Sequence, residues 1–184
     1  MTTRHLVDPA LESFIQGPPL DITHETLPLV RQGLKDIYAG VLGPGDPEVA
    51  VAEHMAPGPD GAPDVRVYVY TPPGEATRRP VFFHIHGGGY ILGDAAMMTP
   101  LSQARARTLG CVVVSVDYRL APETHFPGSL EDNYAALRWM NENAKQLGID
   151  TSRIAVKGES AGGGHAAMLT LAVREVRRAK RGRG

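Results

Sequence analysis

Residues 1–45 carry apolar side chains at the spacing of amphipathic helices. The clearest stripe recurs at alternating gaps of three and four, which puts its members on one face of a helix. Its members are Leu27, Val30, Leu34, Ile37 and Val41. A shorter stripe covers residues 11–15. The pattern predicts helices that need a partner surface to cover their apolar faces.

From residue 46 the pattern changes to the alternation of strands. Apolar and polar positions alternate around residues 48–55 and again at residues 65–70. The segment between them, residues 56–63, is dense in proline and glycine, which favours a turn. We therefore expect an antiparallel hairpin or meander here.

Beyond Pro80 the apolar residues come in short continuous runs. These runs are residues 81–83, 111–116 and 154–156, and the segments between them are long enough for a helix. One such segment, residues 129–148, repeats apolar residues at gaps of four and three. Buried parallel strands joined by helical crossovers have this pattern, so the sequence predicts an α/β fold with a mostly parallel sheet.

Composition is consistent with one globular domain. The chain has 184 residues, of which 42% are hydrophobic and 21% charged. No segment approaches the ~18 apolar residues of a membrane helix, and the N-terminal residues lack the apolar core of a secretory signal. We expect a cytoplasmic protein that does not associate with a membrane. Its single cysteine, Cys111, begins an apolar run and is expected to be a small buried residue rather than a reactive thiol.

Charge is unevenly distributed along the chain. Residues 174–184 contain six basic residues and one acidic residue, whereas the rest of the chain is acidic overall. An acidic body argues against nucleic-acid binding on the folded part. The basic segment predicts a disordered tail.

A serine motif follows the third apolar run. Gly158-Glu159-Ser160-Ala161-Gly162 lies between a predicted strand and a predicted helix, which is the context of a nucleophile elbow. Glycines on both sides permit a tight turn, and the helix N-terminus brings the Ala161 amide to the point where negative charge would develop. The sequence therefore indicates Ser160 as a nucleophile.

A glycine motif follows the first apolar run. His86-Gly87-Gly88-Gly89 would let backbone amides face a substrate oxygen, because no Cβ blocks the bend or the approach. A structural turn without a ligand is the alternative. A phosphate site is less favoured, since the chain has neither the G-x-G-x-x-G spacing nor the lysine-serine ending of a P-loop.

Three stretches together resemble the hormone-sensitive-lipase branch of the α/β-hydrolase family, the bacterial carboxylesterases. They are HGGGYILGD at residues 86–94, DYRLAPE at residues 117–123 with Phe126-Pro127 after it, and GESAGG at residues 158–163. Their order and spacing both match that family. The resemblance implies the N-terminal part of an α/β-hydrolase fold, with residues 1–45 as cap helices, residues 46–173 as an incomplete core and residues 174–184 as the tail.

The resemblance also implies a function and a site. The expected activity is carboxylic ester hydrolysis through an acyl-enzyme on Ser160, acting on a small-molecule ester without a cofactor or metal. Gly87, Gly88 and the amide of Ala161 would form the oxyanion hole. The supporting motif residues are His86, Gly89, Gly158, Glu159 and Gly162.

The remaining members of the triad create an open alternative. In that family the acid and the histidine follow the nucleophile helix, on loops after later strands, and this sequence contains no such strands. His165 lies only five residues past Ser160 on the same helix and is a poor candidate for the base. The alternative is a catalytically inactive fragment that acts as an interaction module through an exposed sheet edge or the basic tail. Association into a homo-oligomer through that edge is one expected consequence.

Other polar residues favour structural roles. His84 and His86 share one face of a strand, but no third ligand at metal-site spacing supports a zinc site. Arg119 and Glu123 are expected to pair across a turn, and Asp132 is expected to be solvated or to cap a helix.

Overall fold

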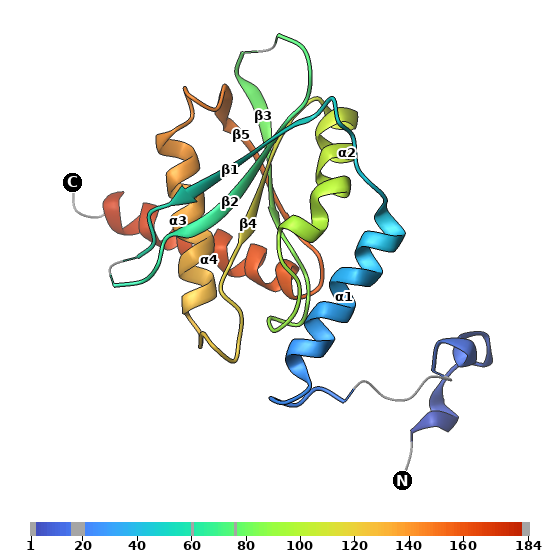
Figure 1. Ribbon diagram of the computed structural model, residues 1–184. Helices are drawn as coiled ribbons and strands as arrows, with labels where there is room; N and C mark the ends of the chain where they lie inside the picture. The colour runs from blue at the N-terminus through green and yellow to red at the C-terminus, as the bar shows by residue number, and fades with distance from the viewer. Residues whose placement is uncertain (1–2, 16–20, 60, 76, 182–184) are drawn as a thin grey trace.

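A single mixed sheet forms the centre of the molecule. The computed structural model describes residues 3–15, 21–59, 61–75 and 77–181 (Figure 1). Five strands lie in the order β1-β2-β4-β3-β5. Their bounds are β1 (Ala50–Ala56), β2 (Val65–Thr71), β3 (Arg79–Ile85), β4 (Val112–Asp117) and β5 (Ile149–Gly158). β2 is antiparallel to both β1 and β4, whereas β3 is parallel to β4 and to β5. The predicted hairpin, and the predicted α/β class with parallel strands after residue 80, are confirmed.

Successive residues of the central strands face opposite sides of the sheet. Phe83 and Val114 point into the larger of two hydrophobic clusters, and their neighbours Phe82 and Val113 point into the smaller one. Both sides of β3 and β4 are therefore covered. This explains why these strands appear in the sequence as continuous apolar runs rather than as an alternation.

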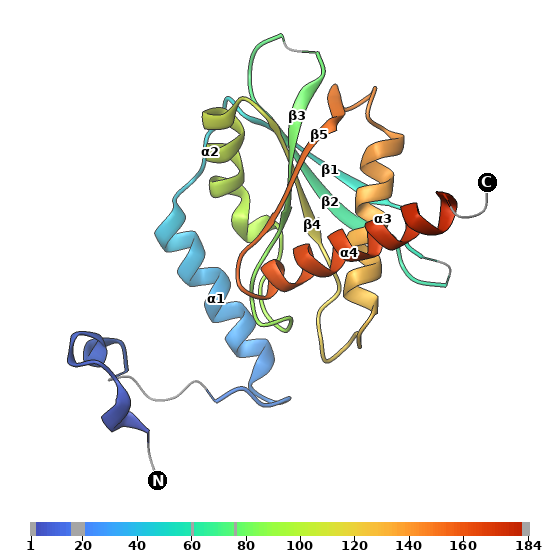
Figure 2. The same ribbon diagram turned by 180° about the vertical axis from the view of Figure 1, so that it is seen from behind.

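Helices cover the two faces unequally (Figures 1 and 2). α3 (Gly128–Glu142) and α4 (Ala161–Arg181) pack on one face, and α2 (Thr99–Leu109) packs on the other. α4 supplies Leu169 to the larger cluster, and α2 supplies Ala106 to the smaller one. The result is a three-layer arrangement whose strands β3 and β5 both end at the same edge of the sheet.

The N-terminal helix α1 (Leu27–Leu42) lies beside the ends of these strands (Figure 1). Leu27 is buried, but the predicted apolar face is wrong at its C-terminal half, because Ile37 and Val41 are 61% and 75% exposed. The face that meets the body contains Leu27 and Leu34 of the predicted stripe together with Arg31. A polar anchor, which hydrophobic periodicity does not detect, sets the orientation of the helix.

That anchor is Arg31. Its guanidinium donates to the carbonyl oxygens of Ile91 at 2.8 Å and Ala121 at 3.0 Å, and it binds both carboxylate oxygens of Glu123 at 2.7 and 2.9 Å. The Arg31 guanidinium holds the pKa of Glu123 down at about 2. One side chain thus joins α1 to two separate loops.

The predicted pairing of Arg119 with Glu123 is wrong. Arg119 instead binds Asp132, with three contacts of 2.7 to 3.0 Å from its side chain and a fourth from its backbone amide. Asp132 is fully buried, so the expected solvated or capping role is also wrong. Since Glu123 is bound by Arg31, each residue of the expected pair has a partner that is more distant in the sequence.

Two boundaries of the predicted organisation differ from the structure. Described residues 174–181 continue α4 rather than forming a disordered segment, consistent with the high helix propensity of alanine, arginine, lysine and glutamate. Two short 3₁₀ helices, Arg4–Leu6 and Pro9–Ile15, lie apart from the sheet (Figure 1). Of the described residues in the expected cap segment 1–45, α1 is therefore the part that approaches the strand ends.

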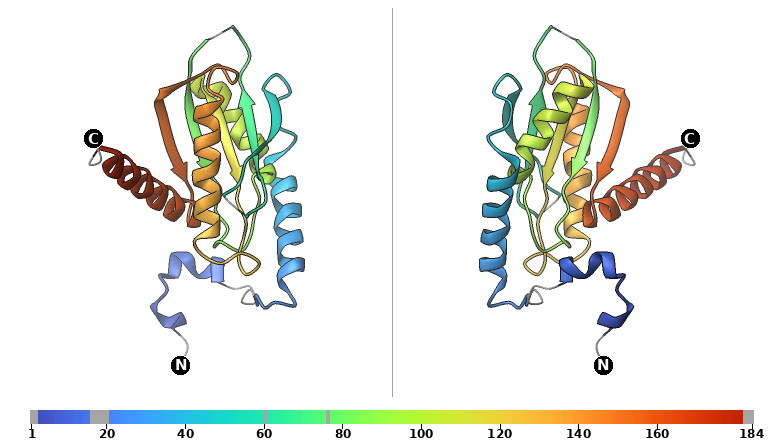
Figure 3. Two further views of the ribbon diagram at one scale, coloured as in Figure 1. Left: turned by 90° about the vertical axis from the view of Figure 1, so that its left-hand side faces the viewer. Right: turned by 90° about the vertical axis from the view of Figure 1, so that its right-hand side faces the viewer.

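β5 lies at one margin of the sheet. Within the described part of the chain it pairs only with β3, so the outer edge of β5 has no neighbouring strand. α4 starts close to this strand and then diverges from the sheet toward its C-terminal end (Figure 3). The space between the two elements opens in that direction.

Candidate active site

Ser160 occupies a tight turn between β5 and α4. Its φ angle is +54°, in the left-handed region that non-glycine residues seldom adopt. A Cβ at Gly158 would overlap the carbonyl oxygen of Gly162, and a Cβ at Gly162 would overlap that of Ile85. Because both obstacles are backbone atoms, only glycine fits at these two positions. The local sequence thus produces the strained strand-to-helix turn that exposes a serine hydroxyl.

The glycine loop after β3 packs directly against this turn. A Cβ on Gly87 would lie 2.7 Å from the carbonyl oxygen of Glu159 and 3.5 Å from the Cβ of Ser160. Gly88 has a φ angle of +129° and Gly89 of +61°, and a Cβ on Gly88 would overlap the carbonyl group of Leu92. The structure therefore brings the two sequence motifs together, with Gly87 beside Ser160.

Strand register explains why they meet. In the parallel ladder between β3 and β5, Ile85 is opposite Gly158. Both motifs leave their strands immediately after this pair, so both emerge at the same edge of the sheet. This agrees with the general rule that ligands of open α/β sheets bind outside the carboxyl ends of the strands.

Both motifs line one cavity of about 540 Å³. Ser160, Gly87 and Gly88 form part of its wall, and α1 adds Leu34 and Tyr38 on the opposite side. Apolar side chains dominate the remaining wall, with a few charged groups between them. These other lining residues are His86, Gly89, Leu92, Gly93, Asp94, Met97, Met98, Leu101, Arg105 and Glu159.

Glu159 is the most heavily bonded residue of the turn. It accepts hydrogen bonds from His84 at 2.8 Å and Arg105 at 2.7 Å, and it also binds Lys157. Burial raises the pKa of Glu159, but the bonds from Lys157 and His84 and the charge of Arg105 outweigh it, and the pKa falls to about 2. The carboxylate directly before Ser160 is therefore ionised and tied to β3, α2 and β5 together.

His84 is held neutral within this network. Burial lowers the pKa of His84 to about 4, although its bond to Glu159 acts in the opposite direction. Its Nδ1 atom is 2.9 Å from the hydroxyl of Ser115, so both ring nitrogens are occupied by protein groups. Among the described residues, no group of three or more histidine, cysteine, aspartate or glutamate side chains is placed to hold a metal ion.

His86 and His165 both lie behind the glycine loop. The His86 ring stacks on Tyr118 with the ring centroids 4.2 Å apart, and the His165 ring is steeply inclined to the rings of Tyr118 and Tyr90, with centroid distances of 4.8 and 4.9 Å. Burial lowers the pKa of both histidines. In the described residues no hydrogen bond joins Ser160 to either ring.

Sequence reasoning missed several contributors to the site. Arg105, Tyr118 and Tyr38 come from three different elements and reach the site only through the tertiary fold. No local motif marks Arg105 or Tyr38. Tyr118 stands inside the DYRLAPE stretch, and that stretch was the one available signal for its proximity.

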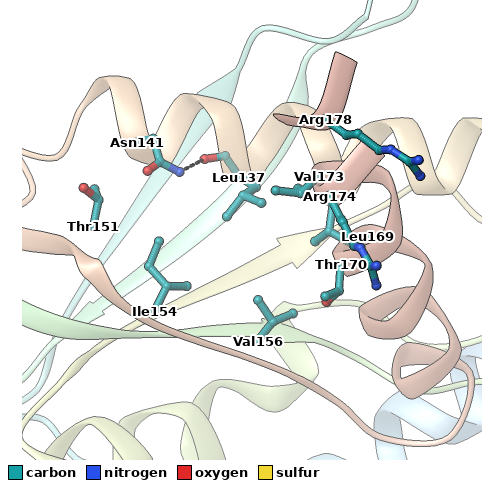
Figure 4. Close-up of a pocket in the computed structure, with 10 residues that line it drawn as sticks. All are labelled: Leu137, Asn141, Thr151, Ile154, Val156, Leu169, Thr170, Val173, Arg174 and Arg178. Carbon is teal, nitrogen blue, oxygen red and sulfur yellow. Dashed lines mark hydrogen bonds between the residues drawn. The ribbon is translucent and has the colours of Figure 1, made fainter. Parts of the chain in front are cut away.

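A second cavity, of about 620 Å³, lies elsewhere, between α3, α4 and the outer side of β5 (Figure 4). Its walls are mainly apolar, and Arg174 and Arg178 stand one helical turn apart on α4 (Figure 4). It shares no lining residue with the cavity beside Ser160. The complete lining is Leu137, Asn141, Thr151, Ile154, Val156, Leu169, Thr170, Val173, Arg174 and Arg178.

The fold and the serine turn together define a class, the α/β proteins in which a tight, glycine-flanked turn at a serine joins a parallel strand to a helix. The family described as alpha/beta hydrolase fold matches residues 82–181. A carboxylesterase of Mycobacterium tuberculosis, NlhH, is 39% identical over 173 residues, which are 92% of this chain and 53% of that protein. The arylesterase of Saccharolobus solfataricus is 33% identical over 92% of this chain and 55% of its own length.

Solved structures agree with these relatives. A bacterial heroin esterase superposes with a TM-score of 0.81 at 42% identity, covering 95% of this chain and 55% of that one. This chain belongs to the α/β-hydrolase fold family. It spans about half the length of the relatives it matches. No helix among the described residues is long and apolar enough to cross a membrane.

Proposed function

We propose that this chain carries the nucleophile and the oxyanion hole of a serine carboxylic ester hydrolase. The observation that supports this best is the contact between the motifs, in which Gly87 leaves no room for a side chain between itself and the turn that holds Ser160. An amide donor must lie about 3 Å from the position of the oxyanion to be effective. Direct packing of the glycine loop on the serine turn supports such a placement, because it brings the Gly87 backbone next to Ser160. The similarity to proteins named carboxylesterase, esterase and arylesterase points the same way.

The proposed chemistry begins at the Ser160 hydroxyl. Its oxygen attacks the ester carbonyl carbon, the carbonyl electron pair moves to the oxygen, and the amides of Gly87, Gly88 and Ala161 donate to the resulting oxyanion. Collapse of this intermediate expels the alkoxide and leaves an acyl group on Ser160, which water then hydrolyses. A general base takes the serine proton and passes it to the leaving alkoxide.

We place the acid and the histidine of the triad outside this chain. His165 is turned into an aromatic contact with Tyr118 and Tyr90 and has no bond to Ser160. His84 uses both ring nitrogens for Ser115 and Glu159. On this proposal full turnover needs a general base that neither His84 nor His165 supplies.

Covalent labelling tests the nucleophile without requiring turnover. An alkyl p-nitrophenyl phosphonate should attach to Ser160, because the turn and the oxyanion hole stabilise a tetrahedral adduct. Peptide mass spectrometry locates the adduct, and Ser160→Ala serves as the matched control. Label on another residue, or equal labelling of Ser160→Ala, would contradict the assignment.

Steady-state hydrolysis tests the missing base. The purified chain should hydrolyse p-nitrophenyl butyrate weakly, since the oxyanion hole and binding retain only about 10³–10⁴-fold catalysis over water once a triad member is lost. A turnover near the ~10 s⁻¹ typical of enzymes would show that the chain contains its own base.

The cavity beside Ser160 supports small esters as substrates. Its volume of about 540 Å³ and its walls of leucine, methionine and tyrosine suit short and medium acyl chains. In a protein completed by a polypeptide that carries the base, hydrolysis should fall once the acyl chain exceeds about eight carbons. A series of p-nitrophenyl esters measures this, and a flat profile to sixteen carbons would contradict a pocket of this size.

A second candidate function is binding of a polypeptide strand at the outer edge of β5. The cavity at this edge presents Ile154 and Val156 on β5 and Val173 on α4, with Arg174 and Arg178 nearby (Figure 4). An unpaired edge offers main-chain hydrogen bonds to an extended segment, the apolar wall accepts alternate side chains, and the arginines favour acidic residues. The occupant we infer is therefore an extended segment with alternating apolar residues and an acidic end.

Fluorescence anisotropy with designed peptides distinguishes strand addition at β5 from non-specific hydrophobic binding. A labelled peptide of alternating valine and threonine that ends in two glutamates should bind, and its backbone N-methylated version should not. Arg174→Glu with Arg178→Glu should weaken binding of the glutamate peptide and favour a lysine-ended one. Equal binding of the N-methylated peptide would argue against strand addition.

A further inference from the structure

His165 is an unusual residue for its position. It lies in the first turns of α4, its side chain is 1% exposed, and neither ring nitrogen has a hydrogen-bond partner among the residues that the structure describes. Burying polar atoms without partners costs free energy. A ring retained at such a cost needs a compensating role, and the contacts of the ring indicate which one.

Those contacts are aromatic. The ring meets Tyr90 at a centroid distance of 4.9 Å and an interplanar angle of 86°, and Tyr118 at 4.8 Å and 69°. Both are edge-to-face arrangements, the geometry that aromatic pairs prefer. His165 thus fills the space between two tyrosines that come from different loops.

Each tyrosine is connected to one end of the glycine segment. Tyr118 stacks on the His86 ring at 4.2 Å, and its hydroxyl donates to the carbonyl oxygen of His86 at 2.8 Å. Tyr90 is the residue directly after Gly89. The segment Gly87–Gly89 is therefore flanked at both ends by residues of one row of ring contacts. This row, which consists of His86, Tyr118, His165 and Tyr90, connects the segment to the helix that follows Ser160.

Tyr90 itself is strained. Its φ angle is +67°, a conformation that is costly for a bulky residue and persists only where surrounding contacts enforce it. Its hydroxyl lies over Gly164, where a Cβ would overlap it, and its ring rests on His165. Gly164 and His165 of α4 together form the surface against which the Tyr90 side chain packs, and this surface is called the seat of Tyr90.

We propose that His165 is a positioning residue for the oxyanion hole. Its ring couples the glycine segment to the nucleophile helix, so that the donors at Gly87 and Gly88 keep a fixed place relative to Ser160. The role rests on the shape of the ring, which contacts Tyr90 and Tyr118, because within the described part of the chain neither nitrogen has a hydrogen-bond partner. The proposal rests on the ester hydrolase function, because only there does the place of these amides affect a reaction.

Three variants test the coupling. His165→Phe keeps an aromatic ring and removes both nitrogens, His165→Ala removes the ring, and Gly164→Ala blocks the seat of Tyr90. His125→Ala, at an exposed loop histidine, is the matched control. The first readout is amide hydrogen exchange at Gly87–Gly89, followed by NMR together with the amides of β4. The second is the rate of Ser160 phosphonylation, resolved into reagent binding and maximal rate.

His165→Ala and Gly164→Ala should each speed exchange at Gly87–Gly89 at least tenfold while exchange in β4 stays unchanged. The same variants should lower the maximal phosphonylation rate at least tenfold with little change in reagent binding, whereas His165→Phe should stay within about twofold of the parent. A purely structural role would instead change β4 as well. Should His165→Ala fail to fold, Gly164→Ala and Tyr90→Leu carry the same comparison.

Two results would overturn the proposal. One is unchanged exchange at Gly87–Gly89 in His165→Ala and Gly164→Ala, and the other is a loss in His165→Phe equal to that in His165→Ala. Failure of the function itself is distinguishable, because then the parent protein would not be labelled at Ser160 while the exchange measurement would still report on the coupling.

Discussion

The serine turn and the outer edge of β5 lie at opposite extremes of packing. Around Ser160 backbone segments pack directly against one another, so that a methyl group added at Gly158 or Gly162 would overlap backbone atoms. At the outer edge of β5, by contrast, apolar side chains line an open cavity of about 620 Å³, and Leu171 on the neighbouring helix is 59% exposed. The contacts that shape the serine turn all come from described residues of this chain. The geometry of the site is therefore specified locally, although the sheet around it has a free edge.

Side-chain truncation gives the largest expected contrast between the regions. Phe83→Ala removes a fully buried ring from the centre of the sheet and should lower the free energy of unfolding by about 3–5 kcal/mol. Ile154→Ala, at the open cavity, should cost about 1 kcal/mol, because its side chain is already partly exposed. Urea denaturation measures both. Equal losses would mean that the edge of β5 is covered in solution.

Glycine substitution tests the tight packing at the site itself. Gly162→Ala places a Cβ onto the carbonyl oxygen of Ile85 and should cost about 3 kcal/mol, since backbone must move. Gly33→Ala on α1 meets nothing within 4 Å and should stabilise the helix by about 0.5–1 kcal/mol. Thermal unfolding of the two variants compares them directly. If Gly162→Ala left the free energy of unfolding unchanged, the two motifs would pack less closely than described.

Acid should weaken the network behind the turn. Burial lowers the pKa of His84 to about 4, from about 6.5 in the unfolded chain. Above pH 6.5 the imidazole is therefore neutral in both the folded and the unfolded state. As the pH falls from 6.5 toward 4, the unfolded chain binds a proton that the folded chain resists, and up to about 3 kcal/mol of stability is lost. Glu159, with a pKa of about 2, stays ionised in the folded protein throughout this range.

Denaturation at pH 7, 5 and 4 measures this loss. His84→Gln should flatten the pH dependence without abolishing it, because burial also lowers the pKa of His86 and His165. An identical slope in the parent and in His84→Gln would place the acid sensitivity elsewhere.

The smallest effect is expected at the mouth of the open cavity. Arg174→Ser changes an exposed side chain on α4 and should alter the free energy of unfolding by no more than about 0.5 kcal/mol. A larger loss, measured in the same urea series, would indicate that this arginine has a partner in solution.

Local pattern predicted much of this molecule. Apolar runs identified β3 and β4 because those strands are covered on both faces, and the glycine motifs identified the serine turn because its geometry depends on neighbours in sequence. The errors share one cause. The orientation of α1 and the partners of Arg119 depend on side chains far away in sequence, such as Arg31 with Glu123, which no local periodicity encodes.

The pairing of Ile85 with Gly158 also determines when the site can form during folding. The two motifs are separated by roughly 70 residues, so the site has no precursor in any local hairpin or helix and forms only when β3 and β5 come together in the correct register. Chain synthesis delivers the glycine loop before the serine. The glycine loop and the serine turn thus meet only once the ladder between β3 and β5 has formed, and a chain that has not yet formed this ladder lacks the proposed site.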